Sequence, residues 1–204
     1  MTVQIENRDN GIRIVRLTGA AASKSFSRES MPIIAGAIDD GLSDQSVRAM
    51  IITGDGKFFS AGADIHAFQE AIDTNDAPQL IRDLTNILHP LLIRIRQSST
   101  IVVGAINGAA AGGGLGLALA CDVRIGSPKA KLAASYASIG LSPDGGTTWL
   151  LPRLVGEHVS RRFFFENQIW SAEVALGAGA LDEVVEAEDL INRSIEVATN
   201  WSQW

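Results

Sequence analysis

The stretch TIVVGAINGAAAGGGLGLALACD, residues 100–122, decides the fold class of this chain. No charged residue stands between Arg96 and Asp122, and residues 101–121 include six glycines and six alanines. An uncharged run of this length satisfies the length requirement for a transmembrane helix. Each glycine, however, costs roughly 1 kcal/mol relative to alanine in a helix interior. The β-branched start, the break at Asn107-Gly108 and the apolar end predict a buried strand, a tight loop and a buried helix.

The glycine cluster in this stretch matches neither common phosphate-binding motif. A P-loop starting at Gly108 would need lysine after Gly113, where the sequence has Gly114. A Rossmann fingerprint starting at Gly112 would need its third glycine where Leu117 stands. Glycines at the start of a helix still leave backbone N–H groups uncovered at the positive end of the helix dipole. The cluster therefore predicts half of an oxyanion-binding site.

The composition predicts one soluble globular domain. The chain has 204 residues, of which 46% are hydrophobic and 20% charged, and this length suffices for one well-buried core. A net charge of -6 makes nucleic acid an unexpected partner. The N-terminus has no secretion signal, so we expect a cytoplasmic protein that does not bind membranes. Cys121 is the single cysteine, and the absence of CxxC or His/Cys clusters predicts neither disulfides nor a metal site.

A second turn of small residues precedes the glycine stretch. Asn10-Gly11 predicts a β-hairpin over residues 3–17, and residues 47–53 form a predicted buried strand. Small residues then lead into a helix that begins near Asp64, which exposes further N–H groups. A helix over 78–97 completes a strand, helix, strand, helix order typical of a right-handed βαβ unit. We therefore expect both turns at the same edge of a partly parallel sheet, where ligands bind in open α/β folds.

Three blocks of sequence resemble one enzyme family. FSAGADI at 59–65, GAINGAAAGGGLGLALACDVRI at 104–125 and IGLSPDGGTTWLLPRLVG at 139–156 together resemble the crotonase family, the enoyl-CoA hydratases and isomerases. The resemblance implies an α/β fold built as a spiral of ββα units. Family members usually continue beyond this length, so the C-terminal helical region is expected to be shortened. We predict a single crotonase-like domain over 1–204, with a core of about 1–186 and a partial C-terminal helix at 187–204.

The resemblance also implies the substrate and the residues that bind it. Family members act on acyl-CoA thioesters through an oxyanion hole for the thioester carbonyl. By position, its donors are the N–H groups of Ala63 and Gly113, at the two predicted helix starts. Coenzyme A is part of the substrate, and no further cofactor is expected. The other implied substrate or CoA contacts are Lys24, Ala61, Asp64, Ile65 and Tyr136.

The acid and base positions depart from those of the hydratases. Hydratases resemble one another in two glutamates that would fall at Gly116 and close to Tyr136, and neither position is acidic here. Loss of a general acid or base costs on the order of 10²–10⁴-fold in rate. Asp144 stands in a PDGG motif that resembles isomerases in which this carboxylate moves a proton along the acyl chain. The sequence therefore predicts an acyl-CoA double-bond isomerase with fatty or ring-type substrates, although Asp144 could also cap the helix starting near Gly145.

Two other functions remain open from the sequence. In a dehalogenase-like reaction Asp144 would attack an aromatic ring, with Tyr136 and His89 as candidate helpers, although His89 is expected at the surface of its helix. Alternatively, the short C-terminus suggests a non-catalytic, truncated acyl-CoA binder. We further expect a homo-oligomer, a trimer or hexamer if the shortened C-terminus allows.

Overall fold

The strands of this chain form two sheets in the computed structural model, which describes residues 2–203. The first sheet has the order β1 (Val3–Arg8), β2 (Ile12–Leu17), β3 (Ala49–Thr53), β5 (Ile101–Ile106), β7 (Val123–Gly126) and β10 (Glu183–Val184). The second has the order β4 (Phe58–Ser60), β6 (Ala109–Ala111), β8 (Lys131–Ala133) and β9 (Ile169–Ser171). Only the β1–β2 and β8–β9 pairs are antiparallel among the described strands.

Each repeat of the fold uses one strand from each sheet and then a helix. The chain passes from β3 to β4, from β5 to β6 and from β7 to β8, and each pair leads on to a helical segment. This is the ββα spiral that the crotonase resemblance implies. The helices are α1 (Ala20–Ser23), α2 (Ser30–Ser43), α3 (Ile65–Asp73), α4 (Ala77–Gln97), α5 (Gly113–Ala120), α6 (Thr147–Val155), α7 (Glu157–Phe165), α8 (Ala172–Ala178) and α9 (Leu190–Trp201), with 3-10 turns at Asp9–Gly11 and Ala137–Ile139.

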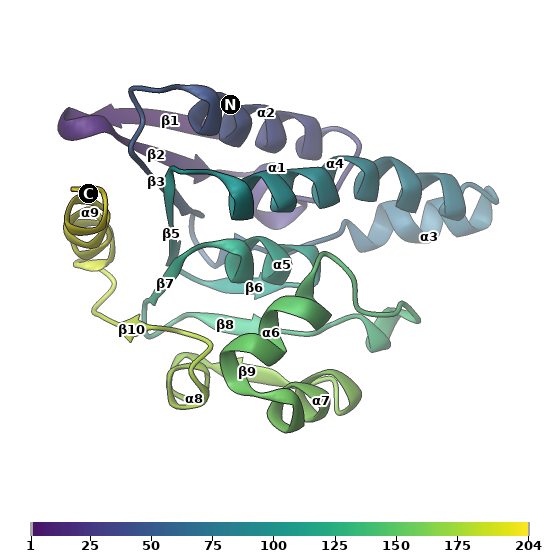
Figure 1. Ribbon diagram of the computed structural model, residues 1–204. Helices are drawn as coiled ribbons and strands as arrows, with labels where there is room; N and C mark the ends of the chain where they lie inside the picture. The colour runs from purple at the N-terminus through teal and green to yellow at the C-terminus, as the bar shows by residue number, and fades with distance from the viewer. Residues whose placement is uncertain (1, 204) are drawn as a thin grey trace.

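Helices cover both faces of the first sheet (Figure 1). Val102 and Ile106 on β5 point toward α2, α4 and α5 and join the larger apolar core. Val103, between them, points the other way and packs in a smaller core with Leu190 and Val197 of α9. Successive side chains on a strand alternate between faces, so the continuous apolar sequence of β5 is explained by burial on both sides. None of the helices within residues 2–203 is long and apolar enough to cross a membrane.

The N-terminal hairpin forms as predicted. Asn10 and Gly11 have positive φ angles of 64° and 74°, the conformation that makes Asn-Gly the commonest hairpin turn. The β1–β2 register pairs Arg8 with Ile12 next to this turn. The hairpin extends the first sheet at its edge beyond β3, away from the two helix entrances.

The predicted strand–loop–helix over 100–122 contains an additional strand. After the break at Asn107, β6 pairs in parallel with β4, so both helix entrances leave the second sheet rather than the first. The Asn107 side chain connects the β5–β6 segment to the β3–β4 segment. It accepts from Gly54 N at 2.9 Å and donates to the Phe58 carbonyl oxygen at 3.1 Å. The prediction that both small-residue turns lie at the same edge of a sheet is correct, but this edge belongs to the second sheet.

Candidate active site

The two helix entrances place backbone donors side by side. Strands β4 and β6 are parallel neighbours, and each is followed by a glycine with positive φ, 81° at Gly62 and 53° at Gly112. The next residue in each case is a predicted donor, Ala63 or Gly113. A β-carbon on Gly62 would lie 2.5 Å from the Ala111 carbonyl oxygen, so the turns are in direct contact. Within residues 2–203 no acceptor is found for the N–H of Ala63 or of Gly113, which leaves both free to bind an oxyanion.

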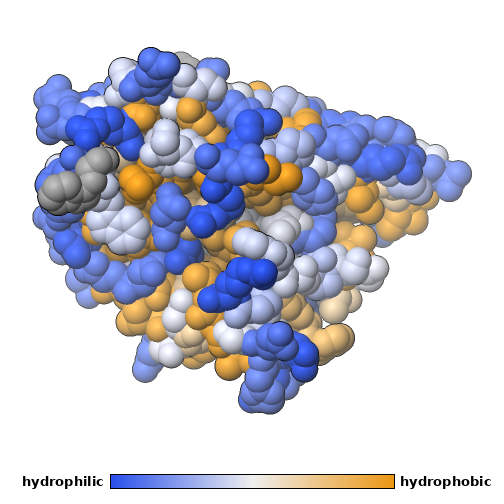
Figure 2. All heavy atoms as spheres, viewed as in Figure 1, coloured by the Kyte–Doolittle hydropathy of each residue, from blue (hydrophilic) through white to orange (hydrophobic). Residues whose placement is uncertain are grey.

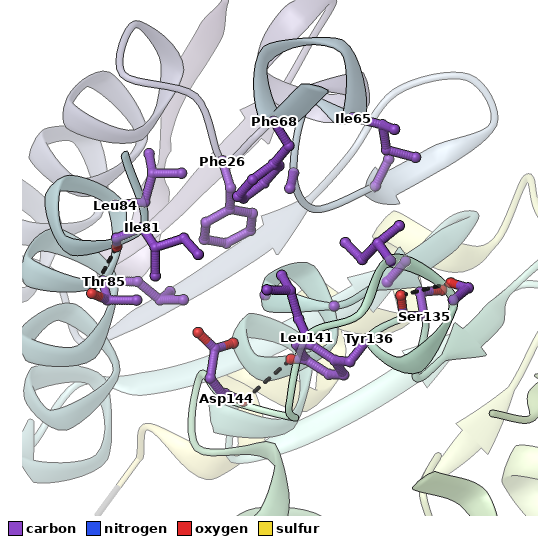
Figure 3. A pocket seen from close by; sticks show the side chains of 18 residues that line it. Phe26, Ile65, Phe68, Ile81, Leu84, Thr85, Ser135, Tyr136, Leu141 and Asp144 are labelled. Atoms are coloured by element: carbon purple, nitrogen blue, oxygen red, sulfur yellow. Dashed lines mark hydrogen bonds between the residues drawn. The ribbon is translucent and has the colours of Figure 1, made fainter. Parts of the chain in front are cut away.

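These donors border an apolar pocket of about 230 Å³ (Figure 3). The chain segments that line it are the two turns, helices α3 and α4, and the loop over 135–144. The predicted site residues that line this pocket are Ala61, Ala63, Ile65, Gly113, Tyr136 and Asp144. Its apolar walls are formed by Phe26, Ile65, Phe68, Ile81, Leu84, Leu88, Ile139 and Leu141. The structure therefore brings most of the predicted substrate contacts together.

Helix α3 forms an exposed wall of the pocket. It projects from the body together with the start of α4 (Figure 1), and Figure 2 shows apolar surface along the lower side of this projecting end. Ile65 and Ile72 of α3 are 63% and 61% exposed, and Ala71 is the only residue of α3 that is fully buried in the described chain. Exposed apolar surface at a pocket wall is typical of a ligand-binding groove.

Lys24 and Asp64 lie in a neighbouring, polar hollow rather than in the apolar pocket. Lys24 Nζ and Asp64 Oδ2 are 2.8 Å apart, and the hydrogen bond from Lys24 is the main cause that holds the pKa of Asp64 below its usual range. Asp64 also caps α3, because its Oδ1 accepts from His66 N at 3.1 Å. These two predicted contacts therefore form a pair of their own beside the acyl pocket.

The turn at Asp144 is held by main-chain contacts rather than by the Asp144 carboxylate. The Asp144 carbonyl oxygen accepts from Thr147 N at 3.1 Å, from Thr147 Oγ1 at 2.8 Å and from Tyr136 Oη at 3.2 Å. Helix α6 has Gly146 as its N-cap and receives no side-chain cap. The capping interpretation of Asp144 is therefore wrong for its carboxylate, which projects into the pocket toward α4 (Figure 3).

The surroundings of Asp144 favour a basic carboxylate. Partial burial is the largest influence and raises the pKa of Asp144 above its ordinary value, while His89 and Tyr136 partly offset this. Asp144 is the only acidic residue among those described that line the pocket. Tyr136 is 5% exposed, and burial raises the pKa of its phenol, so this group is a neutral donor.

His89 lies closer to Asp144 than the sequence indicates. As expected, it is exposed on the surface of α4, with 47% of its side chain accessible. Its Nε2 is nevertheless 4.0 Å from Asp144 Oδ2, a distance that a small side-chain rotation would shorten to a hydrogen bond. The packing of α4 against the 142–146 turn produces this proximity, and no local motif signals it.

The position of the first hydratase glutamate cannot hold a side chain here. A β-carbon on Gly116 would lie 2.4 Å from the Gly145 carbonyl oxygen, because the Asp144 turn rests directly on α5. That contact is closer than real β-carbons show, so any larger residue would displace the turn. Tyr136, close to which the second glutamate would fall, holds the same turn through its hydroxyl. Gly116 and Tyr136 therefore both contact the turn that carries Asp144.

Metal ligands do not gather at this site. Across residues 2–203, no group of three or more His, Cys, Asp or Glu side chains lies close enough to hold an ion. Cys121 is buried in the core, where burial raises the pKa of its thiol to about 12. This cysteine therefore packs as an apolar residue.

Comparison with known proteins agrees with the fold. The model of the enoyl-CoA hydratase/isomerase family matches residues 7–203. The "Probable enoyl-CoA hydratase EchA14" of Mycobacterium tuberculosis is 32% identical over 190 residues, which cover 93% of this chain and 72% of that protein. The 1,2-epoxyphenylacetyl-CoA isomerase of Escherichia coli is 31% identical over 190 residues, with the same coverage of both chains. A Mycobacterium abscessus structure assigned to the enoyl-CoA hydratase/isomerase class has a TM-score of 0.90 and 29% identity, covering 98% of this chain and 76% of that chain. The chain therefore belongs to the enoyl-CoA hydratase/isomerase family and has its crotonase fold.

Proposed function

We propose that this chain is an acyl-CoA double-bond isomerase that converts a 3-enoyl-CoA into the conjugated 2-enoyl-CoA. The observation that carries the proposal is a single carboxylate, Asp144, in an apolar pocket that also holds two backbone donors without acceptors. One base is sufficient for this reaction, because the proton removed from C2 of the acyl group is returned to C4.

The Ala63 and Gly113 N–H groups bind the thioester carbonyl oxygen in this mechanism. As the C2–H bond breaks, its electron pair moves toward the carbonyl, and negative charge grows on that oxygen. Each well-placed donor can stabilise the transition state by about 3 kcal/mol in a site that excludes water. The donors lie in the turns that follow two parallel strands, β4 and β6, so little reorganisation accompanies the reaction.

The Asp144 carboxylate accepts the C2 proton and becomes a neutral acid. The resulting dienolate carries electron density at C4, where the same group returns the proton, and the double bond shifts from C3–C4 to C2–C3. A base works best when its pKa approaches the working pH, so the raised pKa of Asp144 suits this role. The apolar walls match an uncharged acyl group, either a fatty chain or a ring.

Hydration of a double bond is a weaker match to the site. It requires carboxylates that hold and activate a water molecule, and by the resemblance those of the hydratases would fall at Gly116 and close to Tyr136, where no residue is acidic. The contact between Gly116 and Gly145 leaves no volume for a glutamate. The isomerase among the relatives is consistent with the proposal, although relatives named as hydratases are equally similar.

The test compares two reactions of the same protein. We expect a 3-enoyl-CoA to gain the absorbance of a conjugated thioester, and a 2-enoyl-CoA to be hydrated slowly or not at all. Asp144→Asn should remove the first signal. If the wild-type protein shows no Asp144-dependent signal with any fatty or ring-type 3-enoyl-CoA, the proposal is wrong.

A second candidate function is favoured by the 4.0 Å approach of His89 to Asp144. In a dehalogenase-like reaction, the carboxylate would attack a halogen-bearing ring carbon, and the halide would leave with the C–halogen electron pair. His89 would then take a proton from the water that hydrolyses the aryl ester. An aryl ester trapped on Asp144 in the His89→Asn variant, detected by mass spectrometry, would favour this reaction over isomerisation.

A further inference from the structure

A second apolar groove continues the acyl pocket along helix α4. Thr85, in the first half of the helix, lines the pocket, whereas His89 and Ile93 line the groove. Residues four apart lie on the same face of a helix, so these three follow one line along α4. Asp144 is the residue that lines both hollows. The pocket and the groove are therefore consecutive segments of one trough.

The groove has apolar walls that are open to water. Its volume is about 470 Å³, and Trp149 and Leu150 of α6 form the wall opposite α4. Ile93 and Trp149, which both line this groove, are 55% and 56% exposed. The Arg153 guanidinium carbon lies 3.7 Å from the centre of the Trp149 ring and holds the indole in place. An apolar ligand in this groove would remove both exposed side chains from water.

We infer that this groove binds the distal end of a long apolar acyl group. The inference rests on the proposed function, because a base that reaches both C2 and C4 requires the acyl chain to run past Asp144. Beyond C4 the chain then continues along α4 into the groove. The axis from Thr85 to Ile93 spans about 12 Å, so an extended acyl chain of medium or greater length is needed to fill it. The trough therefore selects long acyl groups over short ones.

The experiment measures binding of unreactive, saturated acyl-CoAs of two lengths. Butanoyl-CoA and dodecanoyl-CoA are titrated into the wild-type chain, Trp149→Ala and Ile93→Ser by calorimetry. Both substituted side chains are more than half exposed, so the fold should be retained. We expect each variant to bind dodecanoyl-CoA about ten-fold more weakly, from lost apolar contact, and butanoyl-CoA within about two-fold of wild type. The matched control is Trp201→Ala, another half-exposed tryptophan, which lies on α9 across the first sheet.

Three results would overturn the inference. The first is unchanged affinity of both groove variants for dodecanoyl-CoA. The second is an equal loss for both acyl-CoAs, which would indicate a general structural effect. The third is a loss of the same size in Trp201→Ala.

Isomerisation of 3-enoyl-CoAs by the same variants separates this inference from the proposed function. If the wild type isomerises long and short substrates but the groove variants keep its chain-length preference, the groove inference fails and the isomerase proposal stands. If no acyl-CoA binds to the wild type, the proposed function fails and the groove inference fails with it. A loss of kcat/KM confined to long substrates supports both.

Discussion

The donor turns and the Asp144 turn reach the same pocket by opposite means. In the proposed mechanism, Ala63 and Gly113 act through main-chain N–H groups, whose positions follow from two parallel strands and two glycines with positive φ. Asp144 would act through its side chain, on a turn that is anchored by its carbonyl oxygen and by contact with Gly116. The proposed donors therefore depend on the backbone of the fold, whereas the proposed base depends on one side chain. Substitutions at these two turns should therefore differ in how much they change the rate and how much they change the stability.

Loss of the Asp144 carboxylate should have the largest effect on rate and little on stability. Asp144→Asn removes the base but keeps the carbonyl contacts to Thr147 and Tyr136. We expect kcat for 3-enoyl-CoA isomerisation to fall on the order of 10²–10⁴-fold. The thermal midpoint and the affinity for a saturated acyl-CoA should stay close to those of the wild type. A kcat within a few-fold of wild type would contradict the assigned role.

Loss of one backbone donor should have the next largest effect. Ala63→Pro removes the N–H, since proline has none, and should lower kcat on the order of 10²–10³-fold. Ala63→Gly keeps the N–H and is the matched control, expected within a few-fold of wild type. Steady-state kinetics on both variants provide the comparison. Equal activity of the two variants would show that the Ala63 N–H does not bind the oxyanion.

Disturbing the contact beneath the Asp144 turn should affect stability as well as rate. Gly116→Ala places a β-carbon against the Gly145 carbonyl oxygen and should lower the free energy of unfolding by about 1–3 kcal/mol. Gly177→Ala is the control, because a β-carbon on this exposed helical glycine meets no described atom within 4 Å. That variant should be as stable as wild type or more stable by up to about 1 kcal/mol. Urea denaturation distinguishes the two, and equal stabilities would contradict the close contact.

The pH dependence should show the smallest effect. In the proposed mechanism Asp144 is active as a carboxylate, so kcat/KM should fall as the pH drops through its pKa, which burial holds above the usual aspartate range. The charge of His89 lowers this pKa, so His89→Asn should raise it and move the acidic limb of the profile to higher pH. His158→Asn, on the exposed helix α7, is the control and should leave the limb in place. A limb that moves to lower pH in His89→Asn would contradict the electrostatic account.

The sequence predicts local structure and the donors better than it predicts tertiary contacts. The Asn10-Gly11 hairpin and both small-residue turns follow from backbone preferences that a few residues encode. Strands β4, β6 and β9, of three residues each, are not predicted, because they are stabilised by pairing with distant strands. The approach of His89 to Asp144 likewise depends on how α4 packs against a loop more than fifty residues later in the chain.

Some predicted contacts separate in the structure, and others remain to be tested. Lys24 and Asp64 pair with each other, because Asp64 turns away from the pocket to cap α3. The sequence does not explain why Gly116 stands where the resemblance places a hydratase glutamate. The structure offers a physical reason, because a side chain at Gly116 would collide with Gly145. The homo-oligomer and the domain limits stay predictions.

The most direct test of the central claim follows the proton itself. A 3-enoyl-CoA carrying deuterium at C2 is incubated with the wild-type chain and with Asp144→Asn, and the product is analysed by NMR. We predict a 2-enoyl-CoA in which part of the deuterium has moved to C4, and a loss of this transfer in Asp144→Asn. Failure of the wild type to form labelled or unlabelled 2-enoyl-CoA, or equal transfer by both proteins, would contradict the account.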